Sequence, residues 1–406
     1  MKVLLLSNLF PTSRDPVRGL FTLQLAQALS RQGTVHVVVP LPWIGNDPLS
    51  RTLFPARTRE FGGLAPEMSF GDVHATYARY PLLPKVSRRW HARSMYWGIA
   101  ATVRRLHREI GFDVVNAHWL DPDGIAAAWL ARDLGIPVVL TALGCDVNMY
   151  AHDAQRRGSI LGAIAQAAAV TTVSEPLKQG LVDEGVSAAK IAVIPNGVDT
   201  ERFHPRARAE CRAALGLPQD APLIVCVSRL SEEKGVDVLV RAFSQVRSAV
   251  PGAMLALVGA GPLQADIERE AAAAGLGDSL RLVGAVPHEQ VALWIGAGNV
   301  SCLPSLREGH PNAAMEALAS GRPLVASRVG ALPGMIQPAT GLLVEPGDAG
   351  ALARALITAL GAVWSDETIS ASVREGSWQR AAREYLRVYG DALRNTARID
   401  GAISLN

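Results

Sequence analysis

Short runs of aliphatic and β-branched residues alternate along this chain with Ala/Leu-rich segments of helical period. This alternation restricts the fold more than any other feature. Runs that are apolar at every position are typical of strands in a parallel sheet that helices cover on both faces. The chain is therefore predicted to be an α/β protein. The runs expected to be strands are Val3–Ser7, Val35–Val39, Val114–Asn116, Val138–Thr141, Val170–Val173, Ile191–Ile194, Leu223–Val227, Met254–Val258, Leu280–Val283, Val300–Leu303, Leu324–Ala326 and Leu342–Val344. Helices are expected at Leu20–Leu29, Ile125–Leu134, Val236–Val246, Pro262–Ala274, Ala313–Ser320 and Ala349–Leu360.

The alternation runs twice, which predicts two domains. The first run ends near "PNGVDTERFHP", residues 195–205, and the second begins near Pro222. A chain of 406 residues also exceeds the usual size of a single core. We expect two doubly wound, Rossmann-like domains, 1–205 and 206–377, with a C-terminal helix at about 378–395 completing the first. Such sheets bind ligands at the carboxyl ends of their strands, so a ligand is expected in a cleft between two facing domains.

Composition and charge exclude several classes of protein. Apolar residues make up 49% of the chain, which argues against disorder, and a net charge of +3 does not indicate a nucleic-acid-binding protein. None of Cys145, Cys211, Cys226 and Cys302 forms a CxxC pair, so buried reduced thiols are expected rather than disulfides or a metal site. The opening run "MKVLLLSNLF" is too short for a signal peptide and predicts a buried first strand. These features favour a cytoplasmic protein.

The stretch "VCVSRLSEEKGVDVLVRAF" predicts an anion site between a strand and a helix. Arg229 follows the strand directly, and Lys234 lies just before the helix. Cations beside the amino end of a helix favour a bound anion such as a phosphate. The alternative is a solvated loop in which Glu232 and Glu233 are the partners of these cations.

The stretch "SLREGHPNAAMEALASGRP" predicts a second site of the same kind. Pro311 suits the first position of a helix, and the backbone N–H groups of Asn312 and Ala313 would point to the end of the preceding strand. Glu308 precedes this helix, and Glu316 lies about one turn inside it. A carboxylate can accept hydrogen bonds from two vicinal hydroxyls, so one glutamate is expected to hold a hexose and the other a ribose, with a diphosphate between them. The alternative is that Glu316 is an ordinary solvated helix residue.

The first half offers weaker candidates. In "SNLFPTSRDPVRGLF", Gly19 near a helix start permits close backbone approach to a ligand, and Arg14 and Arg18 add positive charge. His118 follows a predicted strand and is interpreted either as a catalytic or hydroxyl-binding group or as a structural histidine.

The neighbouring "DPD" is a pattern that can hold a divalent metal and a diphosphate. Because a helix follows at once, Asp123 is interpreted as its N-cap rather than as a metal ligand beside Asp121. No metal is expected.

The stretch from Tyr80 to Ile110 is strongly basic and carries interleaved aromatics. Its single acid is Glu109, and its aromatics include Trp90, Tyr96 and Trp97. Such a helix suits the surface of an anionic membrane. The alternative is a solvated helix with buried aromatics; nucleic acid is not expected, because no reading module accompanies the stretch. The basic residues are Lys85, Arg88, Arg89, Arg93, Arg104, Arg105 and Arg108.

Taken together, these motifs resemble the family 4 retaining glycosyltransferases of the GT-B fold, and the opening resembles the polysaccharide-assembling branch. The motifs are "SRLSEEKGVDVLVRAF", "VSEPLKQGL", "IPNGVDTERFHP", "LVGAGPL", "PSLREGHPNAAMEALASGRPLVAS" and "TGLLVEPGD". The match covers roughly residues 1–390 and is strongest from 170 to 350. An ordered set of this size is far more specific than any single motif.

The resemblance implies roles for individual residues. Glu308 and Glu316 match the family's E-x7-E pair, the first for the donor sugar and the second for the ribose, and Arg229 and Lys234 match the pair that neutralises the leaving diphosphate. His118 matches a histidine near the donor sugar and the acceptor. Gly19 matches a glycine near the donor phosphates, with Asn312 and Ala313 on the same donor side.

The acceptor side is implied less directly, by Arg18 and by Asp146. The segment "TALGCD" keeps Gly144 and Asp146 but has Leu143 where the family often has histidine. His310 stands where an aromatic residue is common, which bears on donor choice.

The expected activity is transfer of a hexose from a nucleotide diphospho-sugar to a glycan or lipid-linked saccharide, without cofactor or metal. The alternatives are a nucleotide-sugar epimerase of similar architecture and a non-enzymatic sugar-binding protein. The expected partners are the donor, the saccharide acceptor and an anionic membrane surface on the cytoplasmic side.

Overall fold

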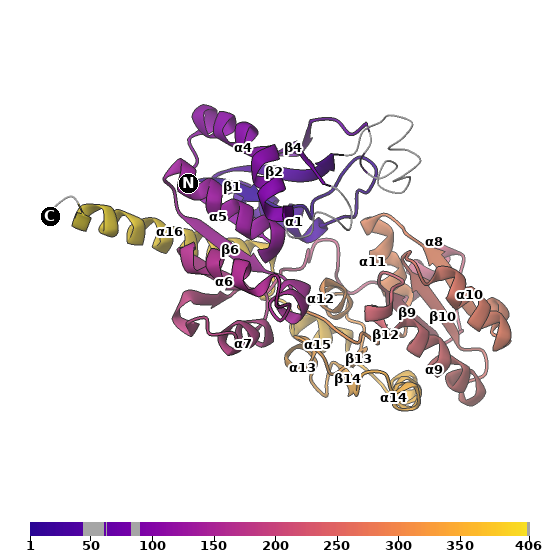
Figure 1. The fold of residues 1–406 in the computed structure, drawn as a ribbon. Coiled ribbons are helices and arrows are strands. Elements are labelled where there is room, and N and C mark those ends of the chain that lie inside the picture. Colours follow the sequence, from indigo (N-terminus) through magenta and orange to yellow (C-terminus); the bar gives the residue numbers. More distant parts are fainter. Residues whose placement is uncertain (44–60, 62, 83–89, 404–406) are drawn as a thin grey trace. The chain divides into compact units, whose positions relative to one another are not determined.

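The computed structural model describes residues 1–43, 61, 63–82 and 90–403, with side chains up to residue 396. The chain forms two compact units, residues 1–196 with 378–406 and residues 197–377 (Figure 1). The boundary after Asn196 precedes the predicted one after residue 205. The reason is that Val198 and Phe203 are buried in the core of the second unit, and the amide of Val198 donates to the carbonyl of Gly376 at 2.8 Å.

In the described part of the first unit, the sheet has eight strands in the order β3-β4-β2-β1-β5-β6-β7-β8. Every pair is parallel except β3 with β4. The strands are β1 (Lys2–Leu6), β2 (Thr34–Trp43), β3 (Glu67–Phe70), β4 (Val73–Pro81), β5 (Val114–His118), β6 (Val138–Ala142), β7 (Ala169–Thr172) and β8 (Ile191–Val193). The helices are α1 (Leu20–Ser30), α4 (His91–Ile110), η2 (Leu120–Gly124), α5 (Ile125–Leu134), η3 (Asp146–Tyr150), α6 (Arg157–Gln166), α7 (Glu175–Asp183), η4 (Ala188–Lys190) and α16 (Trp378–Ile403).

Every residue of the second unit is described, and its sheet has six parallel strands in the order β11-β10-β9-β12-β13-β14. The strands are β9 (Leu223–Val227), β10 (Met254–Val258), β11 (Leu280–Gly284), β12 (Val300–Leu303), β13 (Leu324–Ser327) and β14 (Gly341–Val344). The helices are α8 (Arg208–Leu215), η5 (Glu232–Lys234), α9 (Val236–Ala249), α10 (Gln264–Ala273), η6 (Gly277–Ser279), α11 (His288–Ala297), α12 (Asn312–Ala319), α13 (Leu332–Met335), α14 (Ala349–Gly361) and α15 (Asp366–Ala371).

Both sheets are buried on their two faces, as continuously apolar strands require. In β1, Leu4 and Leu6 belong to one core, and Val3 and Leu5 belong to the core on the other face. Successive side chains of a strand point to opposite faces, so an uninterrupted apolar run supplies two cores at once. The prediction of an α/β protein with helices on both faces of parallel sheets is confirmed.

Three further features complete the fold. The C-terminal helix α16 packs in the first unit, where Tyr385 and Tyr389 are buried in the same core as Val3 and Leu5 of β1. All four cysteines are free, but Cys145 is exposed, contrary to the expectation of a buried thiol. Among the described residues, none of the helices has the length and apolarity needed to cross a bilayer.

Candidate functional site

In the second unit, the chain order reverses between β9 and β12. The strands β9, β10 and β11 run outward on one side, whereas β12, β13 and β14 run outward on the other, and β9 pairs directly with β12. In open α/β sheets the crevice at such a reversal is the usual ligand site, at the carboxyl ends of the two strands. Arg229 and Lys234 follow β9, and Glu308 and α12 follow β12. The sheet therefore brings the two sequence motifs to the same edge.

The loops after β9 and β12 meet through an ion pair. The ammonium of Lys234 lies 2.6 Å from Oε1 of Glu308, and the hydroxyl of Ser305 donates to the same oxygen at 2.7 Å. The side chain of Glu308 is only 7% exposed. The alternative interpretation, a solvated loop in which Glu232 and Glu233 are the partners of its cations, does not hold for Lys234, which pairs with Glu308.

Two glycines allow the loops at this edge to approach so closely. Gly235 has φ 60°, and a Cβ there would lie 2.2 Å from the carbonyl oxygen of Pro304. Gly330, on the loop after β13, has φ 55°, and a Cβ there would lie 2.4 Å from the carbonyl oxygen of Glu308. A side chain at position 235 would force the loops after β9 and β12 apart, and one at position 330 would displace the backbone of Glu308.

The start of α12 remains without a side-chain cap. The helix begins at Asn312, so Pro311 is its N-cap and not the first helical residue that the sequence predicted. No side chain makes a capping hydrogen bond to this end of the helix. The first-turn amides of Asn312 and Ala313 therefore lie at a positive helix end beside Lys234 and Glu308. Arg229 is exposed at the end of β9 and adds a second cation to this edge.

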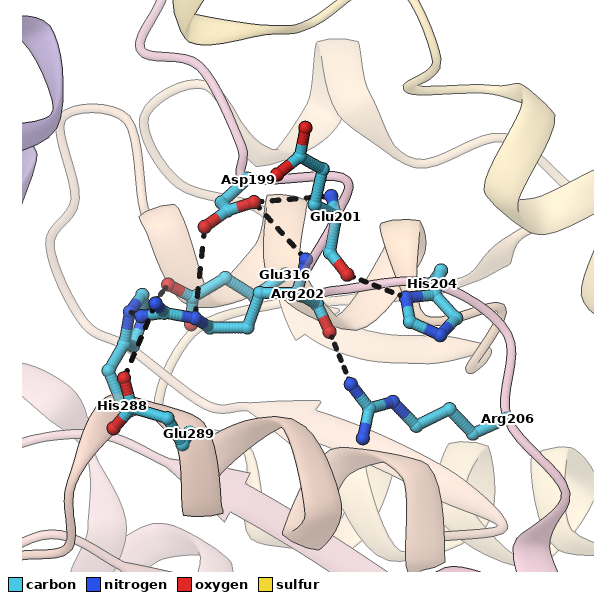
Figure 2. Close-up of polar contacts among 8 residues, drawn as sticks. All are labelled: Asp199, Glu201, Arg202, His204, Arg206, His288, Glu289 and Glu316. Carbon is cyan, nitrogen blue, oxygen red and sulfur yellow. Dashed lines mark hydrogen bonds and ion pairs between the residues drawn. The ribbon is translucent and has the colours of Figure 1, made fainter. Parts of the chain in front are cut away.

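Glu316 is not a solvated helix residue. Its side chain is 13% exposed, and its Oε1 lies 2.9 Å from Nε2 of His288, the first residue of α11. The other ring nitrogen of His288 meets the guanidinium of Arg202 at 2.8 Å (Figure 2). His288 and Arg202 were not singled out from the sequence. They lie 86 residues apart, so no local spacing could have connected them.

In the first unit the chain order reverses between β1 and β5, and His118 is the last residue of β5. Its side chain is buried, its Nδ1 lies 3.4 Å from the hydroxyl of Thr22, and its Nε2 has no hydrogen-bond partner among the described residues. Tyr385 of α16 packs beside the ring, with centroids 6.1 Å apart. Burial lowers the pKa of His118 to about 3, so the imidazole is neutral at physiological pH.

Gly19 and Arg18 lie on the loop after β1, at the same reversal. Gly19 is the N-cap of α1 with φ 58°, and a Cβ there would lie 2.2 Å from the carbonyl oxygen of Leu9. The close approach that the sequence predicted is thus made with the chain's own backbone. Arg18 donates from Nε to the carbonyl of Asn8 at 3.1 Å.

The aspartates of the first unit organise its loops. Asp121 pairs with Arg156 at 3.1 Å, and the carboxylate of Asp123 accepts from the amide and the side chain of Asn8, both at 2.6 Å. The prediction that Asp123 caps the following helix is wrong, because α5 has Gly124 at its N-cap with no side-chain cap. Burial raises the pKa of Asp123 to about 8. Among the described residues, no cluster of three or more histidines, cysteines and acids suited to a metal is found.

Asp146 is fully buried at the turn after β6. Its carboxylate accepts from the backbone amides of Leu120, Leu143, Gly144 and Val147 at 2.7–3.2 Å. Burial raises the pKa of Asp146, and these hydrogen bonds oppose the increase. The carboxylate therefore holds the turn after β6 and the start of η2 together.

Two family models match the chain. The model described as "Glycosyltransferase Family 4" matches residues 19–202, and that described as "Glycosyl transferases group 1" matches residues 221–362. Each match falls almost wholly within one of the two units, and together they contain every candidate site residue named above except Arg14 and Arg18.

Individual proteins agree with these matches. The chain is 29% identical to the putative teichuronic acid biosynthesis glycosyltransferase TuaC of Bacillus subtilis, over 88% of each chain. It is 33% identical to D-inositol 3-phosphate glycosyltransferase 1 of Catenulispora acidiphila, over 67% of this chain and 68% of that one. The structure of Anabaena HepE in complex with UDP-glucose superposes with a TM-score of 0.65 at 18% identity, covering 99% of this chain and 100% of that one. At that identity the likeness establishes the shared fold.

Proposed function

The chain belongs to the family 4, group 1 glycosyltransferases and has their GT-B fold, and from this premise we propose its reaction. The enzyme transfers a hexose from a nucleotide diphospho-sugar to a saccharide or lipid-linked saccharide acceptor, with retention of configuration at the anomeric carbon. The donor binds the second unit at the reversal between β9 and β12, and the first unit handles the acceptor.

The observation that carries this proposal is the Lys234–Glu308 ion pair beside the uncapped start of α12. An ammonium group has three donors, and Glu308 Oε1 accepts one of them. Lys234 can therefore hold Glu308 and a phosphate oxygen at once. Glu308 is then positioned for the hydroxyls of a sugar that is attached to that phosphate.

Breaking the sugar–phosphate bond builds negative charge on the diphosphate and positive character on the anomeric carbon. Arg229, Lys234 and the first amides of α12 stabilise the diphosphate where its charge develops. Glu308 stabilises the sugar through its hydroxyls. No side chain needs to attack the sugar, because in a retaining transfer of this kind the leaving phosphate assists front-face attack by the acceptor.

The substrate class rests on related proteins. HepE has been crystallised with UDP-glucose, a nucleotide diphospho-sugar. The name of TuaC assigns it to teichuronic acid biosynthesis, the assembly of a polysaccharide. A growing saccharide is accordingly the acceptor that we propose for this chain.

The test has two parts. A thermal-shift panel of nucleotide diphospho-sugars identifies the donor by the largest stabilisation, because a ligand that binds only the folded state raises its melting temperature. Nucleotide release is then measured with and without saccharide acceptors. Release that depends on an acceptor supports a transferase. An altered nucleotide-sugar formed without any acceptor would instead establish an epimerase, and binding without turnover would establish a sugar-binding protein.

We further propose that an anionic membrane on the cytoplasmic side is a partner of the first unit, through α4. Trp90 and Trp97 are 55% and 66% exposed, and the guanidinium of Arg93 lies over both rings at 5.3 and 5.9 Å. The three residues follow the spacing i, i+3, i+7 and so share one stripe of the helix. Tryptophan beside arginine suits a lipid headgroup layer.

Several basic and aromatic residues of the stretch from Tyr80 to Ile110 have partners within the protein, which leaves fewer of them for a membrane surface. Arg104 pairs with Asp133 at 2.6 Å, and Arg105 pairs with Glu109 at 3.1 Å. Tyr96 packs edge-on against Trp129, so it belongs to the protein and not to the stripe. Lys85, Arg88 and Arg89 lie outside the described residues.

Co-sedimentation with anionic vesicles tests the surface. Wild type is expected to bind at low salt and to be released as salt rises, because exposed charges are screened. The double variant Arg93→Glu, Trp97→Ser should lose binding, and so should the charge reversal of Arg88, Arg89 and Arg93, while donor binding is unchanged. Arg105→Glu changes the charge of the same helix by as much as Arg93→Glu does, so it serves as the control for the double variant. Equal partitioning of wild type and both variants would reject the surface.

A further inference from the structure

Three polar side chains of the second unit, Glu316, His288 and Arg202, are linked in a row. Nε2 of His288 lies 2.9 Å from Oε1 of Glu316, and Nδ1 of His288 lies 2.8 Å from Nη1 of Arg202 (Figure 2). The side chains of His288 and Glu316 are 12% and 13% exposed, and that of Arg202 is 32% exposed. The three residues come from the start of α11, from α12 and from the segment after Val198.

The chemistry of the three groups fixes the proton in this line. A guanidinium group has only donors, so Nδ1 of His288 must accept from Arg202 through its lone pair. A neutral imidazole that accepts at Nδ1 carries its hydrogen on Nε2. That N–H therefore donates to Oε1 of Glu316. A carboxylate has about four acceptor positions, so Oε2 keeps its capacity for ligand hydroxyls.

The segment after Val198 is built to hold this arrangement. Oδ1 of Asp199 accepts from the amides of Glu201 and Arg202, both at 3.1 Å, which closes a turn. The guanidinium of Arg202 is held from two sides, by Asp199 at 3.7 Å and by Glu289 at 3.3 Å. The next residue, Phe203, is buried and packs on the ring of His288 with centroids 5.0 Å apart. The motif "VDTERF" thus fixes both the plane and the tautomer of His288.

We propose that Arg202 and His288 are positioning residues that orient the carboxylate of Glu316 toward the two ribose hydroxyls of the donor. The inference rests on the proposed function together with the ribose role that the family resemblance implies for Glu316. Without the donated Nε2 hydrogen, Glu316 would lose a fixed rotamer and would face an imidazole lone pair. The preference of the site for a ribose over a sugar that lacks the 2′- and 3′-hydroxyls would then fall, whereas contacts to the base and the diphosphate would remain.

The charged groups around the imidazole give a second consequence. They are Glu316 on α12, Arg202 and Asp199 on the segment after Val198, and Glu289 beside His288 on α11. The guanidinium of Arg202 can only donate, so it keeps the lone pair of Nδ1 occupied. Removing Arg202 frees Nδ1, and the ring is then no longer held in the tautomer that carries its hydrogen on Nε2.

The experiment measures ribose recognition directly by calorimetry. UDP, GDP and ADP are each titrated beside the 2′,3′-dideoxy counterpart, and the ratio of the two dissociation constants is the readout. For the nucleotide that binds best, wild type is expected to prefer the ribose form by about tenfold to a hundredfold, as two hydrogen bonds to a carboxylate allow. Glu316→Ala should bring the ratio close to one.

Three further variants test the line itself. His288→Leu should lower the ratio at least threefold relative to wild type, whereas His288→Gln, which keeps a donor near the position of Nε2, should restore most of it. Arg202→Met should also lower the ratio relative to wild type, because the tautomer of His288 is then no longer fixed. His204→Leu is the matched control, because His204 contacts only the carbonyl of Glu201 in this cluster and should keep the wild-type ratio.

The outcomes separate the two levels of the proposal. A wild-type ratio near one for all three nucleotides would remove the ribose role of Glu316 and this inference with it. A large wild-type ratio that Glu316→Ala abolishes but His288→Leu leaves intact would overturn the positioning role alone. A ratio in Arg202→Met that equals that of wild type would do the same.

Discussion

Each unit has a point in its sheet where the chain order reverses, but the side chains at the two reversals differ in charge and burial. In the second unit the strand reversal is lined by charged, partly exposed groups: Lys234 is 26% exposed, and its partner is the carboxylate of Glu308. In the first unit the reversal is lined by buried groups whose charge is suppressed. Burial lowers the pKa of His118 to about 3 and raises that of Asp123 to about 8.

This difference fits the roles proposed for the two units, donor binding by the second and acceptor binding by the first. A diphosphate gains charge as it leaves, so the second unit needs fixed cations and helix amides at that edge. A hydroxyl acceptor is neutral, and a neutral imidazole can exchange a hydrogen bond with it without the cost of a buried charge. Among the described residues at the first reversal, Nε2 of His118 is a buried polar atom without a hydrogen-bond partner, which fits the acceptor role that we propose for this unit.

The largest expected effect comes from the buried histidine. The folded pKa of His118 is about 3, against an unfolded value of 6.5. Between these values the unfolded state binds more protons, so wild type loses stability as pH falls from 6.5 toward 3. The loss attributable to His118 is roughly 5 kcal/mol over that range. Between pH 7 and pH 4, where roughly 3 kcal/mol of this loss falls, His118→Gln should lose that much less stability than wild type, measured as urea-unfolding free energy.

A surface histidine provides the comparison for that measurement. The side chain of His152 is 55% exposed and pairs with Glu184, so His152→Gln should keep the steep acid dependence of wild type. If His118→Gln lost stability between pH 7 and pH 4 as steeply as wild type does, the buried, neutral state of His118 would be refuted.

The sequence predicted the cores of the fold because their strands are apolar at every position, which only a sheet covered on both faces can use. It failed at β3 and β4, which were not predicted. In β4 (Val73–Pro81), apolar residues alternate with His74, Thr76 and Arg79, so no continuous run marks the strand. β3 is the edge strand and none of its four residues is fully buried, so neither a continuous apolar run nor complete burial marks it, whereas β4 beside it is mostly buried.

The second largest effect concerns the cations of the second unit. Lys234→Ala and Arg229→Ala should each lower turnover by about 10²- to 10³-fold, the usual loss when one group that stabilises a developing charge is removed. The measurement is kcat with saturating donor and acceptor. Melting temperatures of both variants show whether the fold persists.

A cation outside the site controls for the change of charge. Arg269 is 72% exposed and pairs with Asp266 on α10, so Arg269→Ala should turn over as wild type does. Near wild-type turnover in both Lys234→Ala and Arg229→Ala would show that the leaving diphosphate is stabilised elsewhere.

The candidate site was predictable only where its residues follow strands. Arg229, Lys234 and Glu308 each lie just past an apolar run, and parallel strands bring such positions to one edge. The partners of these residues were not predictable. Lys234 and Glu308 are 74 residues apart, and Asn8 and Asp123 are 115 apart. A preceding loop supplied the partner of Asp123, so a pattern typical of an N-cap was misleading.

The smallest expected effect is that of chelation, and it sharpens the comparison between the units. The one sequence pattern suited to a metal is in the first unit, where Asp121 already pairs with Arg156 and Asp123 already accepts two hydrogen bonds from Asn8. Placing a cation there would break these bonds. In the second unit Arg229, Lys234 and the start of α12 already supply positive charge for the diphosphate. Turnover in excess EDTA should therefore stay within about twofold of the untreated enzyme, whereas removal of a catalytic metal would raise the barrier by several kcal/mol. Complete loss of activity that Mg²⁺ or Mn²⁺ restores would contradict this and would make the aspartates of the first unit the first candidates for its ligands.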